Sequence, residues 1–554
     1  MSEGNNGADL VADCLAAEGA THVFGLPGTT VMDLIDSIAV HPELRYLSTR
    51  HEQVAGFMAD GFSRAGGAPG VCLASRGPGA ANLSIAVQNA HDESIPMVAL
   101  IGQVPGTITE RRSFEEMDVV AAFKPFCKWV VEIHHVERIP ELLQRAIRTA
   151  VSGRPGPVVV SLPLDVLQAA TDAAPGRRTR VHLPAPAPDG IAEAARLLAS
   201  AERPAIIAGG GAGAPAALLA LAEATGAPLV TTWLRKGSVP NDDPAFLGAL
   251  GYGAHEVSDR LVHEADVLVA LGCRFSEFTT KRWTLVPAEA ALVHVDIDSE
   301  ELGRVYPPAI GIVSDAGAAA AALTDAVAAL GGDPALDTRR RKRRTALRKE
   351  LDEASVLPAA PEPGATVSSV ALTHAVQRLA AREGVVLVQD VHTFGPWVAR
   401  HIDFDRPRSY YGSAGGAMAW GFPAAMGMAL ARPDERVVAL SGDGSFWMVA
   451  QDLETCVREA IPVINVIVNN YAYGNTRDRQ RTAHGERYHG VFLDNPDFAE
   501  YAKLTGALGI RVTSDEELAD AFEQALVHPG PVLIDVVQDR MEGLPPGLVP
   551  PAAK

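Results

Sequence analysis

The stretch that decides the fold runs from residue 436 to residue 470 and reads RVVALSGDGSFWMVAQDLETCVREAIPVINVIVNN. A β-branched run at 437–440 leads into a Gly-Asp-Gly turn, and a second apolar run at 463–468 ends in two asparagines. A helical segment around 452–459 separates them, so the pattern predicts one βαβ unit with parallel strands buried on both faces. Ligands of such sheets bind at the carboxyl ends of the strands, where Asp443 and Asn470 are therefore expected to converge.

The residue types at these two strand ends indicate a site for a cation and a phosphate. Gly442 and Gly444 flank Asp443 and allow the backbone to approach a phosphate closely. Asp443 and Asn470 offer hard oxygen ligands of the kind that suit Mg²⁺ bound together with phosphate groups. A Gly-Asp-Gly sequence alone is also an ordinary turn, so the prediction rests on the pairing of both motifs.

The rest of the chain repeats the alternation of short apolar runs and Ala/Leu-rich segments. Further strands are expected at 158–162, 205–208, 267–271 and 385–388. Two stretches rich in Pro, Ala and charge, about 169–190 and 331–366, are expected to be linkers. We predict an α/β protein of three doubly wound parallel-sheet domains, and these domains cover residues 1–175, 190–335 and 365–554.

Composition narrows the class of function. The 554 residues carry 67 acidic and 48 basic side chains, a net charge of -19, which argues against binding to nucleic acid or an anionic membrane. There is no apolar run long enough to span a membrane and no secretory pattern at the amino terminus. The five cysteines are scattered without a CxxC motif, as expected for a cytoplasmic protein. The basic run RRRKRR at 339–344 is interpreted as a solvated helix face.

The spacing of the Gly-Asp-Gly and Asn-Asn motifs resembles that of thiamine-diphosphate enzymes. The chain is similar over nearly its whole length to the acetolactate-synthase-like group, which is related to benzaldehyde lyase, oxalyl-CoA decarboxylase and 2-hydroxyacyl-CoA lyase. The segments that carry the resemblance are VFGLPGTT (23–30), RHEQVAGFMADGFSRAGG (50–67), RGPGAAN (76–82), IPMVALIGQVP (95–105), SGRPGPVVVSLPLDV (152–166) and GSAGGAMAWGFPAA (412–425). The resemblance implies a pyrimidine-binding first domain, a nucleotide-binding-like central domain and a third domain that binds diphosphate and Mg²⁺.

The resemblance also assigns roles around thiamine diphosphate. Glu52 would hydrogen-bond the aminopyrimidine ring and promote ionisation of C2. Gly416 would accept from the 4′-amino group, Met418 would wedge the two rings apart, and the carbonyl of Ala472 would join the Mg²⁺ shell. The remaining positions implied to contact the cofactor are Pro78, Asn82, His392, Thr393, Gly442, Gly444, Ser445, Tyr473 and Gly474. In this family the site forms between chains, which implies a homodimer or homotetramer.

Positions implied to face the substrate depart from the family pattern. Gly28, Phe114, Glu115 and Lys128 match residues near the reacting carbon, but Glu115 stands where acetolactate synthases usually carry glutamine. Asn475 and Arg479 stand where those enzymes carry an apolar residue and a tryptophan. Arg477 and Arg479 are interpreted either as a clamp for an anionic substrate or as part of a solvated loop.

The central domain is expected to bind FAD, as in acetolactate synthases, or ADP or the nucleotide end of CoA, as in acyl-CoA enzymes. Arg235 stands where flavin enzymes carry a small glycine, so it would crowd a flavin ring or favour a phosphate. The candidate nucleotide contacts are Arg154, Gly210, Arg235, Arg274, Asp296 and Asp315.

We therefore predict a thiamine-diphosphate- and Mg²⁺-dependent lyase or carboligase acting on a 2-oxo acid or a 2-hydroxy carbonyl compound. The alternative is a 2-hydroxyacyl-CoA lyase that releases formyl-CoA and an aldehyde or ketone. An outside alternative is a cofactor-binding homologue without catalysis, against which the presence of Glu52 argues.

Overall fold

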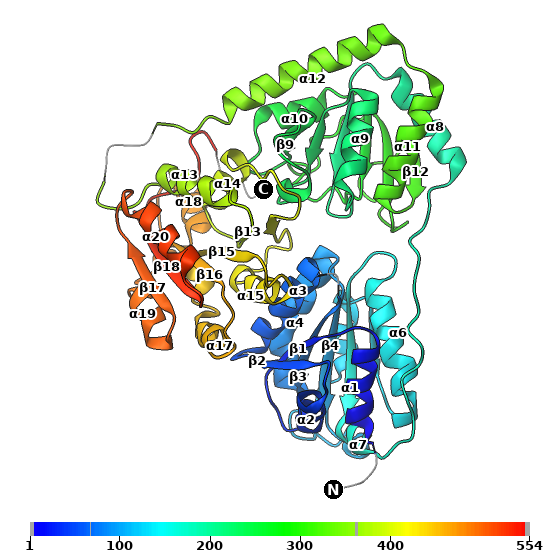
Figure 1. Cartoon of the computed structure of the whole chain (residues 1–554), viewed down its shortest axis with the longest axis vertical. Helices are drawn as coiled ribbons and strands as arrows, with labels where there is room; N and C mark the ends of the chain where they lie inside the picture. Colours follow the sequence, from blue (N-terminus) through cyan, green and yellow to red (C-terminus); the bar gives the residue numbers. More distant parts are fainter. Residues whose placement is uncertain (1–4, 67, 360–363, 549–554) are drawn as a thin grey trace.

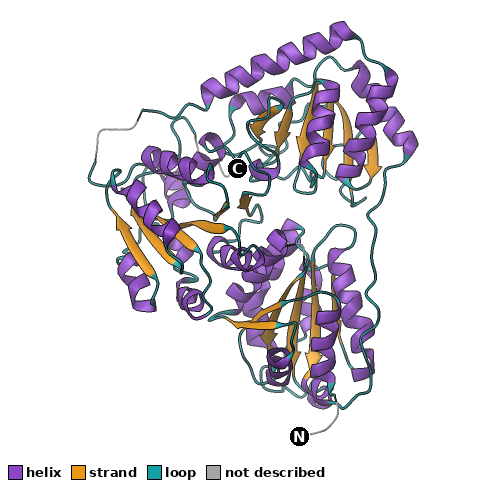
Figure 2. Ribbon diagram, viewed as in Figure 1, coloured by secondary structure: helices purple, strands orange, loops and turns teal. Residues whose placement is uncertain are grey.

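The chain folds around three separate parallel sheets, one for each predicted domain. The computed structural model describes residues 5–66, 68–359 and 364–548, and within these ranges each sheet has six strands with helices on both faces (Figure 1, Figure 2). The predicted α/β class with three doubly wound sheets is confirmed, and all six of the strands expected from apolar runs are present. Among the described helices, none is both long and apolar enough to cross a membrane.

The first sheet has the strand order β2-β1-β3-β4-β6-β5. Its central strands are buried over all but the last residue of β3, which explains their mostly apolar character. The strands are β1 (His22–Gly25), β2 (Arg45–Ser48), β3 (Gly70–Ser75), β4 (Met97–Gln103), β5 (Trp129–Glu132) and β6 (Pro157–Pro163). The helices are α1 (Gly7–Ala17), α2 (Met32–Val40), α3 (Glu52–Gly66), α4 (Arg76–Glu93), α5 (Val119–Phe123), α6 (Ile139–Val151) and α7 (Leu164–Gln168), with 3₁₀ turns η1 (Gly106–Ile108), η2 (Lys124–Phe126) and η3 (Val136–Arg138).

The central sheet has the order β12-β11-β10-β7-β8-β9, and Val269 of β10 is in register with Ile206 and Val293 on its two neighbours. The strands are β7 (Pro204–Ala208), β8 (Leu229–Thr231), β9 (Phe246–Ala249), β10 (Val267–Leu271), β11 (Ala291–Asp296) and β12 (Ile310–Val313). The helices are α8 (Pro188–Ser200), α9 (Pro215–Thr225), α10 (Glu256–His263), α11 (Ala316–Leu330) and α12 (Pro334–Ala354), with the 3₁₀ turn η4 (Lys236–Ser238).

The third sheet has the order β14-β13-β15-β16-β18-β17, so the two strands of the deciding stretch, β15 and β16, are neighbours. The strands are β13 (Val385–Gln389), β14 (Tyr410–Gly412), β15 (Arg436–Gly442), β16 (Ile464–Asn469), β17 (Leu508–Val512) and β18 (Val532–Val537). The helices are α13 (Ser369–Ala380), α14 (Gly395–His401), α15 (Gly421–Ala431), α16 (Asp443–Phe446), α17 (Leu453–Arg458), α18 (Gly474–Ala483), α19 (Phe498–Thr505) and α20 (Glu517–Val527), with the 3₁₀ turn η5 (Ala450–Asp452).

The first and third domains pack through helices α3 and α15, which lie against each other between the two sheets (Figure 1). A Cβ at Gly61 would lie 2.0 Å from the carbonyl oxygen of Ala424, and a Cβ at Gly427 would lie 2.0 Å from that of Met58. Glycine is therefore required at both positions for the two backbones to approach so closely. One apolar core runs continuously from the first sheet through this helix pair to the third sheet.

A buried polar cluster, which we call the three-domain cluster, holds all three domains together. Arg64 on α3 pairs with Asp60 at 2.5 Å and with Glu93 at 3.0 Å, and the indole N–H of Trp420 donates to Asp60. Arg235 of the central domain pairs with Glu93 at 2.6 Å. Burial alone would raise the pKa of Glu93, but the charges of Arg235 and Arg64 hold it at about 2. Removing one partner of such a cluster leaves an uncompensated buried charge.

Most of the second predicted linker is a helix that packs on the central domain. Residues 334–354 form the long helix α12, which lies along the central domain (Figure 1). The basic run on it is not a fully solvated face either, since Arg340 and Arg344 are buried. Arg340 donates to the carbonyl oxygens of Leu198 and Thr225 at the carboxyl ends of α8 and α9, where cations are favoured. The basic run thus holds α12 against the central domain through hydrogen bonds.

Candidate active site

Asp443 lies at the carboxyl end of β15 and is 2% exposed. One carboxylate oxygen accepts the backbone N–H of Gly444 at 2.8 Å. The other accepts the side-chain N–H of Asn495 at 2.8 Å and the backbone N–H of Ala472 at 3.2 Å. Within the described residues no cationic side chain pairs with Asp443, and burial raises its pKa to about 6. A buried carboxylate without a counter-charge is what a site for a divalent cation requires.

Asn470 has the orientation that a ligand to such a cation needs. Its side-chain N–H donates to the hydroxyl of Thr393 at 3.3 Å and to the carbonyl oxygen of Glu542 at 3.4 Å. Among the described residues the amide oxygen of Asn470 accepts no hydrogen bond, so it can bind a cation. The described residues contain no group of three or more His, Cys, Asp or Glu side chains placed to hold a metal ion. That absence is expected where the donors are one carboxylate, one amide and one carbonyl.

His392 supplies an unused donor beside these residues. Its Nδ1 accepts the backbone N–H of Phe394, so the proton belongs on Nε2, which is buried and makes no full hydrogen bond to any described residue, although the Leu440 carbonyl lies near enough to raise the pKa of the ring slightly. Burial lowers the pKa of His392 to about 4 and so keeps the ring neutral. A Cβ at Gly442 would lie 3.1 Å from the His392 Cβ, so the glycine leaves the ring room at the strand end. A buried N–H with no acceptor fits a phosphate oxygen, and the residues present therefore fit a diphosphate with its Mg²⁺.

The other positions predicted to contact the cofactor surround the same edge of the sheet. Gly444 leaves space for the ring of Tyr473, and Gly474 lies against Thr393 and Asn470. Gly416 has φ of +73°, a conformation suited to glycine, and it lies with the partly buried Met418 in the loop between β14 and α15. Ser445 follows in the first turn of α16.

The first domain places Glu52 at the start of α3, directly after β2, where it is 6% exposed. Asn82 donates to its carboxylate at 3.0 Å, and a Cβ at Gly79 would lie 3.0 Å from it. Pro78 lies in the same turn of α4. Gly28 reaches this turn from the loop after β1, since a Cβ there would lie 2.3 Å from the Cβ of Ser75.

Phe114 and Glu115 join this group, and Lys128 does not. The carbonyl oxygen of Glu115 accepts the backbone N–H of Gly77, and the Phe114 ring lies 5.8 Å from the guanidinium of Arg76. Lys128 precedes β5 and donates to the carbonyl oxygen of Ser152 at 2.7 Å. It therefore lies at the amino end of a parallel sheet whose carboxyl end carries Glu52. Within one chain Lys128 and Glu52 therefore lie at opposite ends of the sheet, and the predicted contact of Lys128 with the substrate stays a prediction.

Helix α18 separates the residues predicted to select the substrate. Asn475 and Arg479 are exposed and lie one turn apart on its outer face. Arg477 is fully buried, pairs with the equally buried Asp478 at 2.9 Å, and donates to the carbonyl oxygen of Glu542 at 2.8 Å. Arg477 therefore anchors the carboxyl-terminal segment, and its predicted role as a substrate clamp is wrong.

Four of the predicted nucleotide residues gather at one edge of the central sheet, because each follows or ends a strand. Gly210 follows β7, Arg274 follows β10, Asp296 ends β11, and Asp315 follows β12 and caps α11. Burial and the neighbouring charges of Arg154 and Arg235 lower the pKa of Arg274.

Two of these arginines have structural partners. Arg154 pairs with Glu301 at 2.8 Å. Arg235 is committed to Glu93 and to the carbonyl oxygen of Gly412 at 2.8 Å. Arg235 is thus not free to bind a phosphate, and the prediction that it favours a phosphate is wrong. The Arg235 Nε would lie 3.0 Å from a Cβ at Gly210, so the arginine fills the space beside the glycine turn.

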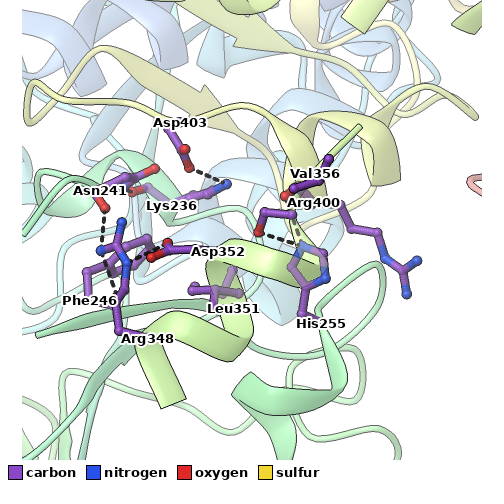
Figure 3. A pocket seen from close by; sticks show the side chains of 14 residues that line it. Lys236, Asn241, Phe246, His255, Arg348, Leu351, Asp352, Val356, Arg400 and Asp403 are labelled. Carbon is purple, nitrogen blue, oxygen red and sulfur yellow. Dashed lines mark hydrogen bonds and ion pairs between the residues drawn. The ribbon is translucent and has the colours of Figure 1, made fainter. Parts of the chain in front are cut away.

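A cavity of about 230 Å³ lies away from these edges, between α12, the central domain and α14 (Figure 3). Its polar side chains bond to their surroundings. Lys236 pairs with Asp403 at 3.1 Å, Arg348 bonds to Asp352 at 2.8 Å, and His255 contacts the carbonyl oxygen of Arg400 at 3.0 Å. With its charges paired, this cavity is a polar seam between domains.

Sequence reasoning missed two residues at the site. Asn495 binds Asp443 from a loop 52 residues away, and no local pattern marks it. Arg76 stands in the quoted RGPGAAN segment, so its position beside Glu115 could have been noticed from the motif.

Models of the thiamine pyrophosphate enzymes (pyrophosphate and diphosphate name the same cofactor) match all three parts of the chain. The N-terminal TPP-binding domain matches residues 5–122, the central domain matches 191–323, and the C-terminal TPP-binding domain matches 390–536. Together with the relatives below, these matches show that the chain belongs to the thiamine-diphosphate enzymes and is an acetolactate-synthase-like member of that family.

The relatives share almost the full length of the chain. A probable acetolactate synthase large subunit of Methanocaldococcus jannaschii is 35% identical over 99% of the chain and 94% of its own length. The acetolactate synthase isozyme 2 large subunit of Escherichia coli K12 is 35% identical over 99% of the chain and 98% of its own length. The acetolactate synthase isozyme 1 large subunit of the same organism is 32% identical over 99% of the chain and 96% of its own length.

Proposed function

We propose that the protein is a Mg²⁺-dependent carboligase that joins two 2-oxo acids with loss of CO2. Two 2-oxo acid anions and one proton would give one CO2 and one 2-hydroxy-3-oxo acid anion. The observation that supports this most strongly is the buried carboxylate of Asp443, which has no cationic partner among the described residues and follows β15, while Asn470 follows the neighbouring parallel strand β16. The relatives named as acetolactate synthases support the choice of reaction.

Thiamine diphosphate, when bound, supplies a carbon nucleophile and an electron sink for cleaving the bond between a carbonyl carbon and its carboxylate. Asp443, Asn470 and the carbonyl of Ala472 would hold Mg²⁺, and the Nε2–H of His392 would donate to a diphosphate oxygen. Gly416 and Met418 would orient the two rings. Glu52, held by Asn82, would exchange a proton with the pyrimidine ring.

We further propose that each site uses two chains. The hydrogen bond from Asn82 keeps the Glu52 carboxylate within the first domain, and the bonds to Asp443 all come from the third domain. A dimer would bring Glu52 of one protomer to the Asp443 edge of its partner. Ultracentrifugation at several protein concentrations, with and without the cofactor, tests this association.

The acyl-CoA alternative loses one of its supports, because Arg477 is buried and cannot bind a CoA phosphate. Arg479 and Asn475 stay candidates for substrate contacts. The binding of a nucleotide at the edge of the central sheet, near Arg274 and Asp296, stays a prediction. An absorption spectrum of the purified protein would detect a flavin.

Mass spectrometry of products tests the proposed reaction. The purified protein with Mg²⁺ and thiamine diphosphate is given pyruvate alone, pyruvate with benzaldehyde, or a 2-hydroxyacyl-CoA. We expect CO2 and a 2-hydroxy-3-oxo acid from pyruvate alone. Formation of formyl-CoA with no product from pyruvate would replace this proposal by the lyase.

A further inference from the structure

Arg76 is an arginine with few partners at the edge of the first domain. Its side chain is 16% exposed, and its Nε is buried and has no hydrogen-bond partner among the residues that the structure describes. Its nearest anion is the carboxylate of Glu115 at 3.7 Å, which is beyond hydrogen-bond length, and the Phe114 carbonyl oxygen lies at 3.5 Å. A guanidinium has five N–H donors, so most of the capacity of Arg76 remains unused.

The backbone is strained at Arg76 and at Glu115. Arg76 has φ of +53° and Glu115 has φ of +60°, a region that non-glycine residues rarely adopt. The Gly77 N–H donates to the Glu115 carbonyl oxygen at 2.9 Å and so joins the two strained residues. Strain of this kind persists where the surrounding structure fixes it, and it gathers at ligand-binding sites.

Arg76 also lies on the helix that carries the residues in contact with Glu52. It opens α4, and three residues later a Cβ at Gly79 would lie 3.0 Å from the Glu52 carboxylate. Asn82, two turns into the helix, donates to that carboxylate. An anion bound by Arg76 would therefore lie beside the residue that is proposed to act on the cofactor.

We propose that Arg76 binds the carboxylate of the acceptor, the second 2-oxo acid of the reaction; this inference rests on the proposed function. The donor loses its carboxylate as CO2, and an ion pair with that carboxylate would stabilise the ground state more than the transition state and slow the step. The acceptor keeps its carboxylate in the product. The Arg76 guanidinium can therefore stay bound to the acceptor carboxylate throughout the reaction.

Glu115 is the partner of Arg76 when no acceptor is bound. The Glu115 side chain is 35% exposed and its contact with Arg76 is long, so the pair is weak and the carboxylate can move toward solvent. The interaction of an incoming carboxylate that forms two parallel hydrogen bonds to the Arg76 guanidinium is stronger than the contact between Arg76 and Glu115. Glu115 thereby sets how readily Arg76 accepts a substrate.

A competition experiment on the holoenzyme tests the proposal. The enzyme is given one 2-oxo acid donor together with equal amounts of a 2-oxo acid acceptor and an aldehyde acceptor, and the two products are quantified. Arg76→Met should lower the ratio of oxo acid product to aldehyde product roughly 10- to 100-fold, the value of a charge-assisted hydrogen bond. Glu115→Gln should raise the ratio up to about fivefold, because the competing carboxylate is gone.

Arg111→Met is the matched control, since Arg111 is an exposed arginine of the loop that carries Glu115, and it should leave the ratio unchanged. An unchanged ratio in Arg76→Met, or a fall in both products alike, overturns the role of Arg76. If Arg76→Met does not fold, a ratio that falls or stays equal in Glu115→Gln overturns it instead. If the native enzyme releases no CO2 from any 2-oxo acid, the proposed function fails first and this inference fails with it.

Discussion

Replacing Asn495 by alanine should weaken cofactor binding although this residue is not expected to touch the cofactor. The Asn495 amide donates to the Asp443 carboxylate at 2.8 Å and to the Asn469 oxygen at 2.9 Å. It also accepts the indole N–H of Trp447. These three bonds fix the loop amide and, through it, the direction in which the carboxylate points.

The size of the effect follows from the first of these bonds. A hydrogen bond to a charged group contributes about 1.5–3 kcal/mol, and loss of a residue that orients a metal ligand typically costs about 10- to 100-fold in affinity. We expect the Mg²⁺-dependent affinity for thiamine diphosphate to fall within that range in Asn495→Ala. Higher Mg²⁺ concentrations should recover part of the loss, because the ligands themselves remain.

Isothermal titration calorimetry of the cofactor at several Mg²⁺ concentrations measures this directly. Asn475→Ala is the control, since it removes an exposed amide from the neighbouring helix α18. If Asn495→Ala binds the cofactor within twofold of the native protein, and its unfolding midpoint is unchanged, then Asn495 does not position Asp443 and the reasoning is wrong.

Further variants test other parts of the structure. Glu52→Gln should bind the cofactor within a few-fold of normal but exchange the C2 proton of thiamine about 10²- to 10³-fold more slowly; native exchange rates measured by NMR would contradict the proposed role. Arg477→Met should cost about 3 kcal/mol of unfolding free energy, because its buried carboxylate partner loses its main ion pair, whereas Arg479→Met should stay within about 0.5 kcal/mol. Equal denaturation midpoints for these two would refute the burial argument. Gly427→Ala should cost about 3 kcal/mol through backbone overlap, and Gly332→Ala, in open space, should cost little in the same denaturation assay.

Much of the fold could be predicted because its signals are local. Runs such as 437–440 and 463–468 are apolar except for Asn465, and a strand covered by helices on both sides buries such a run. The parallel arrangement then placed Asp443 and Asn470 at one edge without further information. The pairing of their motifs thus predicted both their position and the class of cofactor.

The failures come from contacts that are distant in sequence. Helix α18 carries Arg, Asp, Arg and Gln in succession, and nothing in that order shows that Arg477 faces inward. Its burial depends on residues 540–543, more than 60 positions further on, whose backbone carbonyls accept its N–H groups. The contact of Asn495 with Asp443 is of the same kind. The basic run in α12 was misread because its partners are the ends of two earlier helices.

The glycine contact between α3 and α15 has a consequence for the way mutational scans of this protein are interpreted. Gly61 and Gly427 bear no functional group, yet a single added methyl group at either would collide with a backbone oxygen that cannot rotate away. In a survey of all single substitutions, these two positions should tolerate as little as Asp443. Intolerance to substitution therefore does not identify chemistry here. A survey that scores both folded yield and activity per folded molecule would separate the two kinds of position, since the glycine variants would lose yield and the aspartate variants would lose activity.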